Sequence, residues 1–214
     1  MSAREQILGT IRNGLRETAA VPLPPVRRGA PVAVAERAAR FAAVLGRLGA
    51  RVETVADLAA ATARIAAVLD EAKAQQVALS DAPELAAMAP AWRNGRRLLA
   101  SDAAREELLA ADAGVTFAQW GIAETGTLVL ETAREQNRLA SLLPALHIAV
   151  LPVARLLGTL GDAFTAVGGD GGGVRSRTVT FITGPSRTAD IELTLVVGVH
   201  GPKHLHVVLV DDAR

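Results

Sequence analysis

The stretch of sequence that determines the predicted fold runs from Arg51 to Ser80 and reads RVETVADLAAATARIAAVLDEAKAQQVALS. Its first part, Arg51–Val55, is expected to form a short strand. Apolar residues then recur at helical spacing from Leu58 to Leu69, and a second strand is expected at Gln76–Ser80. A strand, a helix and a strand in this order predict two parallel strands joined by a helix that covers the sheet.

The same alternation continues on both sides of this stretch. Upstream, apolar residues from Val34 to Leu48 trace one helical stripe. Downstream, Asp81-Ala-Pro-Glu84 begins a short helix, with its proline near the first turn. A strand at Arg96–Ala100 and a helix at Asp102–Ala111 follow. The alternation predicts the α/β class, with a mostly parallel sheet covered by helices.

The C-terminal half is predicted to be richer in strands. Glycines interrupt β-type residues over 113–131, which predicts a strand, a turn and a second strand at Thr127–Glu131. Further strands are expected at His147–Leu151, Val179–Thr183, Leu193–Val197 and Leu205–Val210. Residues Val153–Phe164 are predicted to be helical, and Gly168–Gly173 to form a flexible loop.

The first 31 residues are predicted to form an arm. Ser2 and Glu5 fit a capping box, and Ile7, Leu8, Ile11 and Leu15 follow helical spacing. The four prolines between 22 and 31 exclude a helix there and predict an extended linker. We therefore expect an N-terminal helical arm and Pro-rich linker at 1–31, and one α/β domain at 32–214.

Composition excludes several classes of chemistry. The 214 residues include no cysteine, which rules out a thiol nucleophile, a Cys-type zinc site and any cofactor bound through Cys, such as an iron–sulfur cluster. Four Phe, two Trp and no Tyr are too few for a base-stacking surface, so no nucleic-acid partner is expected. The chain start lacks a signal peptide, and no apolar run could form a membrane span, so we expect a cytoplasmic protein.

A first polar cluster lies at Glu124-Thr125-Gly126-Thr127, at a turn before a strand. Backbone N–H groups and hydroxyls at such a turn can bind an anion, while Glu124 can accept hydrogen bonds or act as an acid or base. The alternative is a hairpin turn whose threonine hydroxyls satisfy their own backbone.

A second cluster runs over 183–192, directly after an apolar strand, and includes Gly184, Ser186, Arg187, Thr188, Asp190 and Glu192. Because ligands of open α/β sheets bind beyond the carboxyl ends of strands, this position favours a ligand site. Arg187 offers a bidentate fork for a carboxylate or phosphate, and Asp190 could orient it. The alternative is a capped turn with a surface ion pair.

The third cluster contains His200, His204 and His206. His204 and His206 share a strand face, but carboxylate partners for a metal are not evident, and no metal is expected. His200 lies at a turn between Gly198 and Gly201 and is the candidate for ligand contact or pH sensitivity.

Taken in order, these motifs resemble one family. They are Ala123-Glu-Thr-Gly-Thr-Leu-Val-Leu130, then Arg138, Ser141, Pro144 and His147, then 182–192, then Gly198-Val-His-Gly-Pro202. The series resembles the lactate utilization protein C (LutC/YkgG) family, which has a LUD domain, in detail over 113–211. The resemblance implies a three-layer α/β/α fold shared with glucosamine-phosphate deaminases, ribose-phosphate isomerases and CoA transferases (NagB/RpiA/CoA transferase-like). It also implies a role in oxidising L-lactate to pyruvate beside iron–sulfur partner proteins.

Three functions follow as hypotheses. The leading one is an accessory subunit of a lactate-oxidising system, with a small anionic ligand clamped by Arg187 and hydrogen-bonded by Ser186, Thr188 and Thr127. The second is an independent CoA-transferase-like or sugar-phosphate isomerase-like enzyme that uses Glu124 as nucleophile or base. The third is an interaction module in which the basic arm at 4–28 docks a partner.

Overall fold

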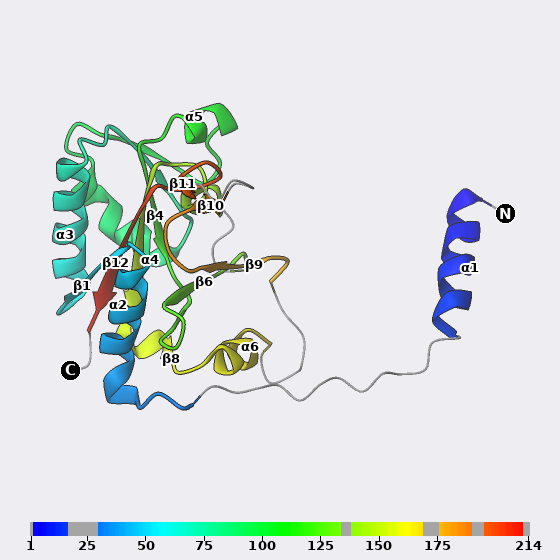
Figure 1. Ribbon diagram of the computed structural model, residues 1–214. Coiled ribbons are helices and arrows are strands. Elements are labelled where there is room, and N and C mark those ends of the chain that lie inside the picture. The colour runs from blue at the N-terminus through cyan, green and yellow to red at the C-terminus, as the bar shows by residue number, and fades with distance from the viewer. Residues whose placement is uncertain (1, 17–29, 134–137, 169–175, 190–194, 212–214) are drawn as a thin grey trace.

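The centre of the fold is a six-stranded sheet with strand order β1-β12-β7-β4-β2-β3. The computed structural model describes residues 2–16, 30–133, 138–168, 176–189 and 195–211. The six strands are β1 (Arg51–Val55), β12 (His204–Val210), β7 (Leu146–Pro152), β4 (Ala113–Phe117), β2 (Gln76–Leu79) and β3 (Arg97–Leu99). Every neighbouring pair is parallel, which confirms the predicted α/β class with a parallel sheet (Figure 1).

One face of this sheet is covered by helices. They are α3 (Leu58–Glu71), α4 (Pro83–Met88) and the 3-10 helix η2 (Ala89–Trp92). Ile65 of α3 and Trp92 of η2 are fully buried in one cluster with Ile148 and Val208 of the sheet. The predicted helical stripe of Leu58–Leu69 therefore has its apolar side against the sheet, where burial of such side chains stabilises the fold.

The opposite face carries a helix together with a second, smaller sheet. The helix is α2 (Arg37–Arg47), preceded by η1 (Val34–Glu36), and the sheet has the order β8-β5-β6-β9. Its strands are β8 (Leu156–Leu157), β5 (Trp120–Ile122), β6 (Thr127–Glu131) and β9 (Val179–Ile182). Phe41, Leu45, Leu128 and Leu209 share the core on this side. Helix α6 (Leu160–Gly168) packs on the far face of the small sheet through Ala163 and Val167.

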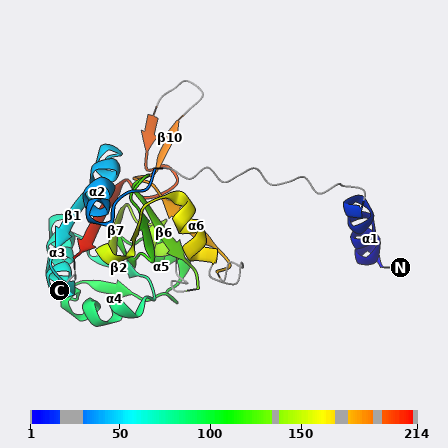
Figure 2. The same cartoon turned by 90° about the horizontal axis from the view of Figure 1, so that it is seen from below.

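A short hairpin, β10 (Arg187–Ala189) with β11 (Leu195–Val197), projects from the body (Figure 2). Three further elements complete the body, namely α5 (Arg105–Leu109), η3 (Arg138–Ser141) and η4 (Val153–Arg155). None of the helices in the described part of the chain combines the length and the hydropathy needed to cross a bilayer.

The prediction of one helix over Val153–Phe164 is wrong. The segment forms η4, then β8, and only then enters α6. Leu156 and Leu157 pair with β5 because the buried Leu156 side chain belongs to the core. Thr159 and Asp162 set the start of α6 by reciprocal hydrogen bonds between their side chains and backbone N–H groups, of 2.9 and 3.2 Å.

Two other helix predictions concern the chain start and α5. Helix α1 (Ala3–Arg16) forms with its capping box, since Ser2 and Glu5 exchange side-chain to backbone hydrogen bonds. The helix predicted at Asp102–Ala111 is limited to α5, where the Glu107 carboxylate accepts a hydrogen bond from the Ala104 N–H. The linker at 17–29 and the loop at 169–173 lie outside the described residues.

Candidate functional site

Three of the motif segments meet at one cleft of about 270 Å³. We call it the motif cleft. Its lining comes from η3, the start of β7, the end of β9 with the turn after it, and the residues around the start of β12. The lining residues used below are Ser141, His147, Thr183, Gly184, Pro185 and Pro202.

His147 is the buried titratable group of the motif cleft. It lies near the start of β7, is 1% exposed, and its Nε2 lies 2.9 Å from the Thr116 hydroxyl. Burial lowers the pKa of His147 to about 4, because desolvation disfavours the charged ring. At neutral pH the ring is therefore uncharged and can both donate and accept a hydrogen bond.

Close packing holds Ser141 at the same place. The Gly114 position of β4 lies against the backbone of Ala140, where a Cβ atom would overlap the Ala140 carbonyl. Glycine thus lets η3 lie directly on the sheet. The Ser141 hydroxyl donates to the Arg138 carbonyl at 2.8 Å, and its oxygen keeps lone pairs that can accept further hydrogen bonds.

The first and second polar clusters meet at a row of threonine hydroxyls. The Oγ1 atoms of Thr125 and Thr127 are 2.7 Å apart, and those of Thr127 and Thr183 are 2.8 Å apart. The antiparallel pairing of β6 with β9 creates this row. It sets Leu128 beside Ile182, and so brings the next residues, Thr127 and Thr183, to face each other. Thr127 is buried, whereas Thr183 is exposed and lines the motif cleft.

Glu124 interacts with a helix end. Its Oε2 accepts a hydrogen bond of 3.2 Å from the Leu160 N–H at the start of α6, and its own N–H donates to the Gly158 carbonyl. A carboxylate at this position interacts favourably with the positive end of the helix dipole. Among the described residues, no hydrogen bond or ion pair joins Glu124 to Arg187 or His200.

Arg187 is engaged at the end of a different helix. It lies on β10, is exposed, and its Nη2 donates to the carbonyl of Leu48, directly after α2. Such a contact satisfies a carbonyl that the helix itself leaves unpaired. Arg187 does not line the motif cleft, so its expected role as an anion clamp beside Thr127 stays a prediction.

The second cluster directly follows the apolar strand β9, as expected, and it lies beside two strands of the central sheet. Ser186 pairs its N–H with the Pro202 carbonyl at 2.9 Å, and Pro202 precedes β12. Leu48, the partner of Arg187, precedes β1. The cluster therefore lies at the amino ends of β1 and β12, because it follows β9 of the small sheet rather than a central strand.

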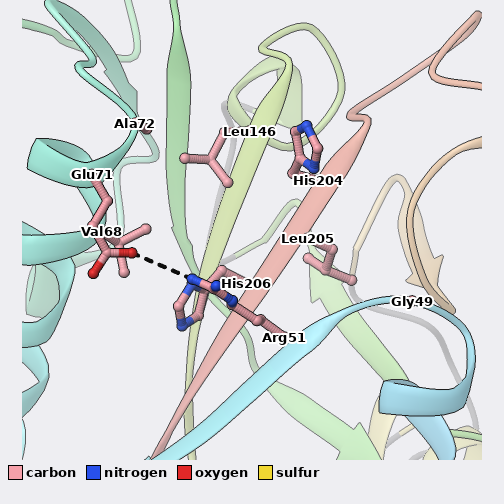
Figure 3. A pocket seen from close by; sticks show the side chains of 9 residues that line it. All are labelled: Gly49, Arg51, Val68, Glu71, Ala72, Leu146, His204, Leu205 and His206. Atoms are coloured by element: carbon pink, nitrogen blue, oxygen red, sulfur yellow. Dashed lines mark hydrogen bonds and ion pairs between the residues drawn. The ribbon is translucent and has the colours of Figure 1, made fainter.

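The remaining predicted site residues are dispersed. Gly184 lines the motif cleft, Thr188 is half-buried on β10, and His200 is exposed in a bend before β12. Asp190 and Glu192 lie outside the described residues. His204 is exposed and His206 is buried, and they line a separate pocket (Figure 3). No group of three potential metal-ligating side chains occurs in the described part of the chain.

A polar cluster that the sequence patterns did not indicate lies at the carboxyl end of β4. Glu131 is 9% exposed, and its oxygens accept hydrogen bonds of 3.1 Å from the Trp120 indole and from the Ser176 hydroxyl. Gln119 accepts a hydrogen bond from the Glu131 N–H and donates to the Phe117 carbonyl. Glu131 is an acid at the end of an otherwise apolar strand, and this pattern could have indicated the cluster. A buried carboxylate needs hydrogen-bond partners of this kind.

Comparison with known proteins places the chain in a family. The LUD domain family matches residues 38–210. A lactate utilization protein C from Shouchella clausii is 40% identical over 108 residues, which are 50% of this chain and 47% of that protein. The protein of that name from Exiguobacterium sp. is 42% identical over 116 residues, covering 52% of this chain and 49% of its own. The chain spans about half the length of these curated relatives.

A solved structure agrees over a larger share of the chain. A DUF162 family protein from Deinococcus radiodurans superposes with a TM-score of 0.64 and 27% sequence identity. The match covers 84% of this chain and 99% of the other. The family match extends from α2 to the end of β12 and so includes both sheets and the motif cleft, and on this evidence the chain belongs to the LUD domain family.

Proposed function

We propose that the chain acts in lactate utilization, as an accessory subunit of a system that oxidises L-lactate to pyruvate, and that it binds a small anionic ligand in the motif cleft. Membership of the LUD domain family and the relatives named lactate utilization protein C support the pathway. The observation that carries the ligand proposal is the convergence of three motif segments, distant in sequence, on one cleft.

The cleft suits a small molecule rich in hydrogen-bonding groups. Its volume of about 270 Å³ exceeds that of a three-carbon hydroxy acid. His147 is uncharged and can donate or accept, and Ser141 and Thr183 line the same cleft. A ligand carboxylate there would be held by neutral hydrogen-bond donors, which can stabilise an anion without a paired cation.

Oxidation of lactate to pyruvate releases two electrons and two protons, and the electrons need an acceptor. This chain has no cysteine to bind an iron–sulfur cluster. We therefore assign the electron-carrying centres to iron–sulfur partner proteins, and ligand binding or positioning to this subunit.

The pathway is tested by deleting the gene in a host without a paralogue. Growth on L-lactate should fail and growth on glucose should persist, because the loss is confined to lactate oxidation. Affinity purification of the complementing protein from lactate-grown cells should bring down a protein with iron–sulfur absorbance. Normal growth of the deletion strain on lactate would refute the role.

The cleft is tested in the same strain with point variants. Thr183→Val removes a hydroxyl of the cleft, whereas Thr165→Val removes an exposed hydroxyl that bonds within α6. We expect slow lactate growth only with Thr183→Val, at equal protein levels, since a hydrogen bond to a charged ligand is worth about 1.5–3 kcal/mol, or at least about tenfold in affinity. Equal growth of the two strains would contradict a ligand in the motif cleft.

A further inference from the structure

An apolar hollow of about 390 Å³ is formed by α6, β9 and the start of β6. We call it the phenylalanine hollow. Its lining consists of Thr125, Thr127, Leu160, Phe164, Phe181 and Thr183. Leu160, Phe164 and Phe181 are 40%, 59% and 38% exposed, and the centres of the two aromatic rings lie 5.8 Å apart. Large apolar side chains gathered at one exposed place are typical of a surface that another protein segment covers.

Helix α1 exposes an apolar side of its own. Ile7, Leu8 and Ile11 share one side of the helix and are 60%, 36% and 52% exposed. Figures 1 and 2 both show α1 apart from the body. An isolated helix of 14 residues is marginally stable in water, and Gly9 and Gly14 lower its helix propensity further. We therefore expect α1 to be stabilised by packing its apolar side on a partner surface.

The segment that joins α1 to the body ends beside the phenylalanine hollow. A Cβ atom at Gly158 would lie 3.4 Å from the backbone nitrogen of Val32, so the two segments lie against each other. Gly158 closely precedes Leu160, and its carbonyl accepts a hydrogen bond of 3.1 Å from the Glu124 N–H. Glu124 is the neighbour of Thr125, which lines the hollow. The chain therefore enters the body within a few residues of the hollow.

The linker favours a hollow on another molecule. Residues 17–29 include Pro22, Pro24 and Pro25, a composition that predicts a semi-rigid spacer of about 3.1 Å per residue, or about 40 Å in total. A spacer of this length that ends beside the hollow holds α1 away from the hollow of its own chain. It can carry α1 to the same hollow of a second copy, because contact in either case requires that the linker length match the span.

The charges of the two surfaces are complementary. Helix α1 carries three arginines and one glutamate, a net charge of +2. The carboxylates of Glu124 and Asp162 lie at the start of α6, where both accept hydrogen bonds from backbone N–H groups, and neither forms an ion pair within the described part of the chain. Arg37 donates to the carbonyls of Val32 and Leu156 instead. Such charges steer and orient a docking helix more than they strengthen its binding.

From the exposed apolar side of α1, the phenylalanine hollow and the position of the linker, we propose that the chain forms a dimer by exchange of arms. In this dimer, α1 of each copy packs its apolar side on Phe164 and Phe181 of the other copy. The exchange makes the same contact twice across a two-fold axis, so the assembly closes at two copies. Helix α1 precedes the region matched by the family, 38–210, and the dimer does not depend on the lactate pathway.

The first test is sedimentation velocity of the full chain over a range of concentrations. Ile11→Ser removes an apolar side chain of α1, and Asn13→Ser places the same residue on the opposite side of the helix. The wild type and Asn13→Ser should form dimers of equal affinity. Ile11→Ser and Phe164→Ser should each weaken the dimer at least tenfold, because a buried apolar side chain is lost from both contacts. All three residues are exposed in the single chain, so the variants should keep the wild-type melting temperature of the body.

The second test identifies the contact by cross-linking, which the absence of cysteine from the chain makes specific. Separate Ile11→Cys and Phe164→Cys proteins are mixed and oxidised, so that a disulfide between positions 11 and 164 joins two different molecules. Mass spectrometry of the digested product should find this disulfide in at least tenfold higher yield than the one from Asn13→Cys mixed with Phe164→Cys. A double variant with both cysteines in one chain should give mainly dimers on a non-reducing gel.

Three results would overturn the proposal directly. They are a chain that stays monomeric at every concentration, equal dimer affinities of the two serine variants of α1, and equal cross-linking yields of the two mixtures. A cross-link confined to single chains of the double variant would place α1 on its own body. Binding of a monomeric protein to vesicles of phosphatidylglycerol and phosphatidylethanolamine would assign α1 to a lipid surface. Either of these two results contradicts a second copy as the partner of α1.

Discussion

Acidification should destabilise this protein through one buried side chain, His147. In the unfolded chain a histidine titrates near pH 6.5, whereas burial lowers the pKa of His147 to about 4 in the fold. The unfolded state therefore binds a proton that the folded state does not bind. The free energy of unfolding decreases as the pH is lowered. The contribution of the neutral ring is complete above pH 6.5 and is lost between pH 6.5 and 4.

The magnitude follows from the two pKa values. Each pKa unit corresponds to about 1.4 kcal/mol, so the interval from 6.5 to about 4 amounts to about 3 kcal/mol. That is a large fraction of the about 5–15 kcal/mol by which domains are usually stable. Because other groups also titrate as the pH is lowered, and burial lowers the pKa of His206 as well, the effect must be measured as a difference between variants.

The assay is urea unfolding followed by circular dichroism at pH 7.5, 6.5, 5.5 and 4.5, on the wild type and on His147→Gln. Glutamine keeps an amide that can hydrogen-bond to Thr116 but does not titrate. Between pH 7.5 and 4.5 the wild type should lose about 2.5 kcal/mol more than the variant, because the loss is complete only below pH 4. His204→Gln changes an exposed histidine of the neighbouring strand and should follow the wild type. Parallel curves for the wild type and His147→Gln would refute the reasoning.

Two further substitutions test the packing. Gly126→Ala should destabilise the fold by about 2–4 kcal/mol, since φ is +62° there and a Cβ atom would lie 2.7 Å from the Leu45 backbone nitrogen. Gly95 also has a positive φ, of +78°, but an added Cβ atom would have no neighbour within 4 Å. Gly95→Ala should therefore lower the free energy of unfolding by only about 1 kcal/mol. Equal losses of melting temperature in the two variants would contradict this account. Trp92→Phe removes the 3.0 Å indole hydrogen bond to the Thr62 carbonyl inside the core. It should lower the free energy of urea unfolding by about 1–3 kcal/mol, and a change under about 0.5 kcal/mol would contradict this prediction.

The central sheet was predictable because its signals are local. The apolar spacing of Leu58–Leu69 and the short strands on both sides of it require only neighbouring residues to agree. The same local logic failed at Val153–Phe164, where apolar content suited either a helix or a strand. The burial of Leu156 beside β5 settled that segment, and the partner strand lies more than thirty residues away along the chain.

The candidate site was predictable only in part. The polar clusters at 124–127 and 183–188 do meet, at the hydroxyls of Thr127 and Thr183. Arg187 and Glu124 carried the chemical expectations, yet each interacts with the end of a helix. The pocket-lining roles of His147 and Arg51 depend on strand order, which local patterns do not encode.

The amino-acid sequence by itself determined the class of fold, the family resemblance and the exclusion of any cysteine-bound centre, since composition and local periodicity suffice for these. Only the tertiary structure decided which polar residues share a cavity. Parallel strands that are distant in sequence become neighbours in the sheet, and β12, the last strand, lies between β1 and β7. That insertion places His204 and His206 beside Arg51, and Pro202 beside Ser186, because hydrogen-bonded strand pairing, rather than distance along the chain, sets which side chains meet.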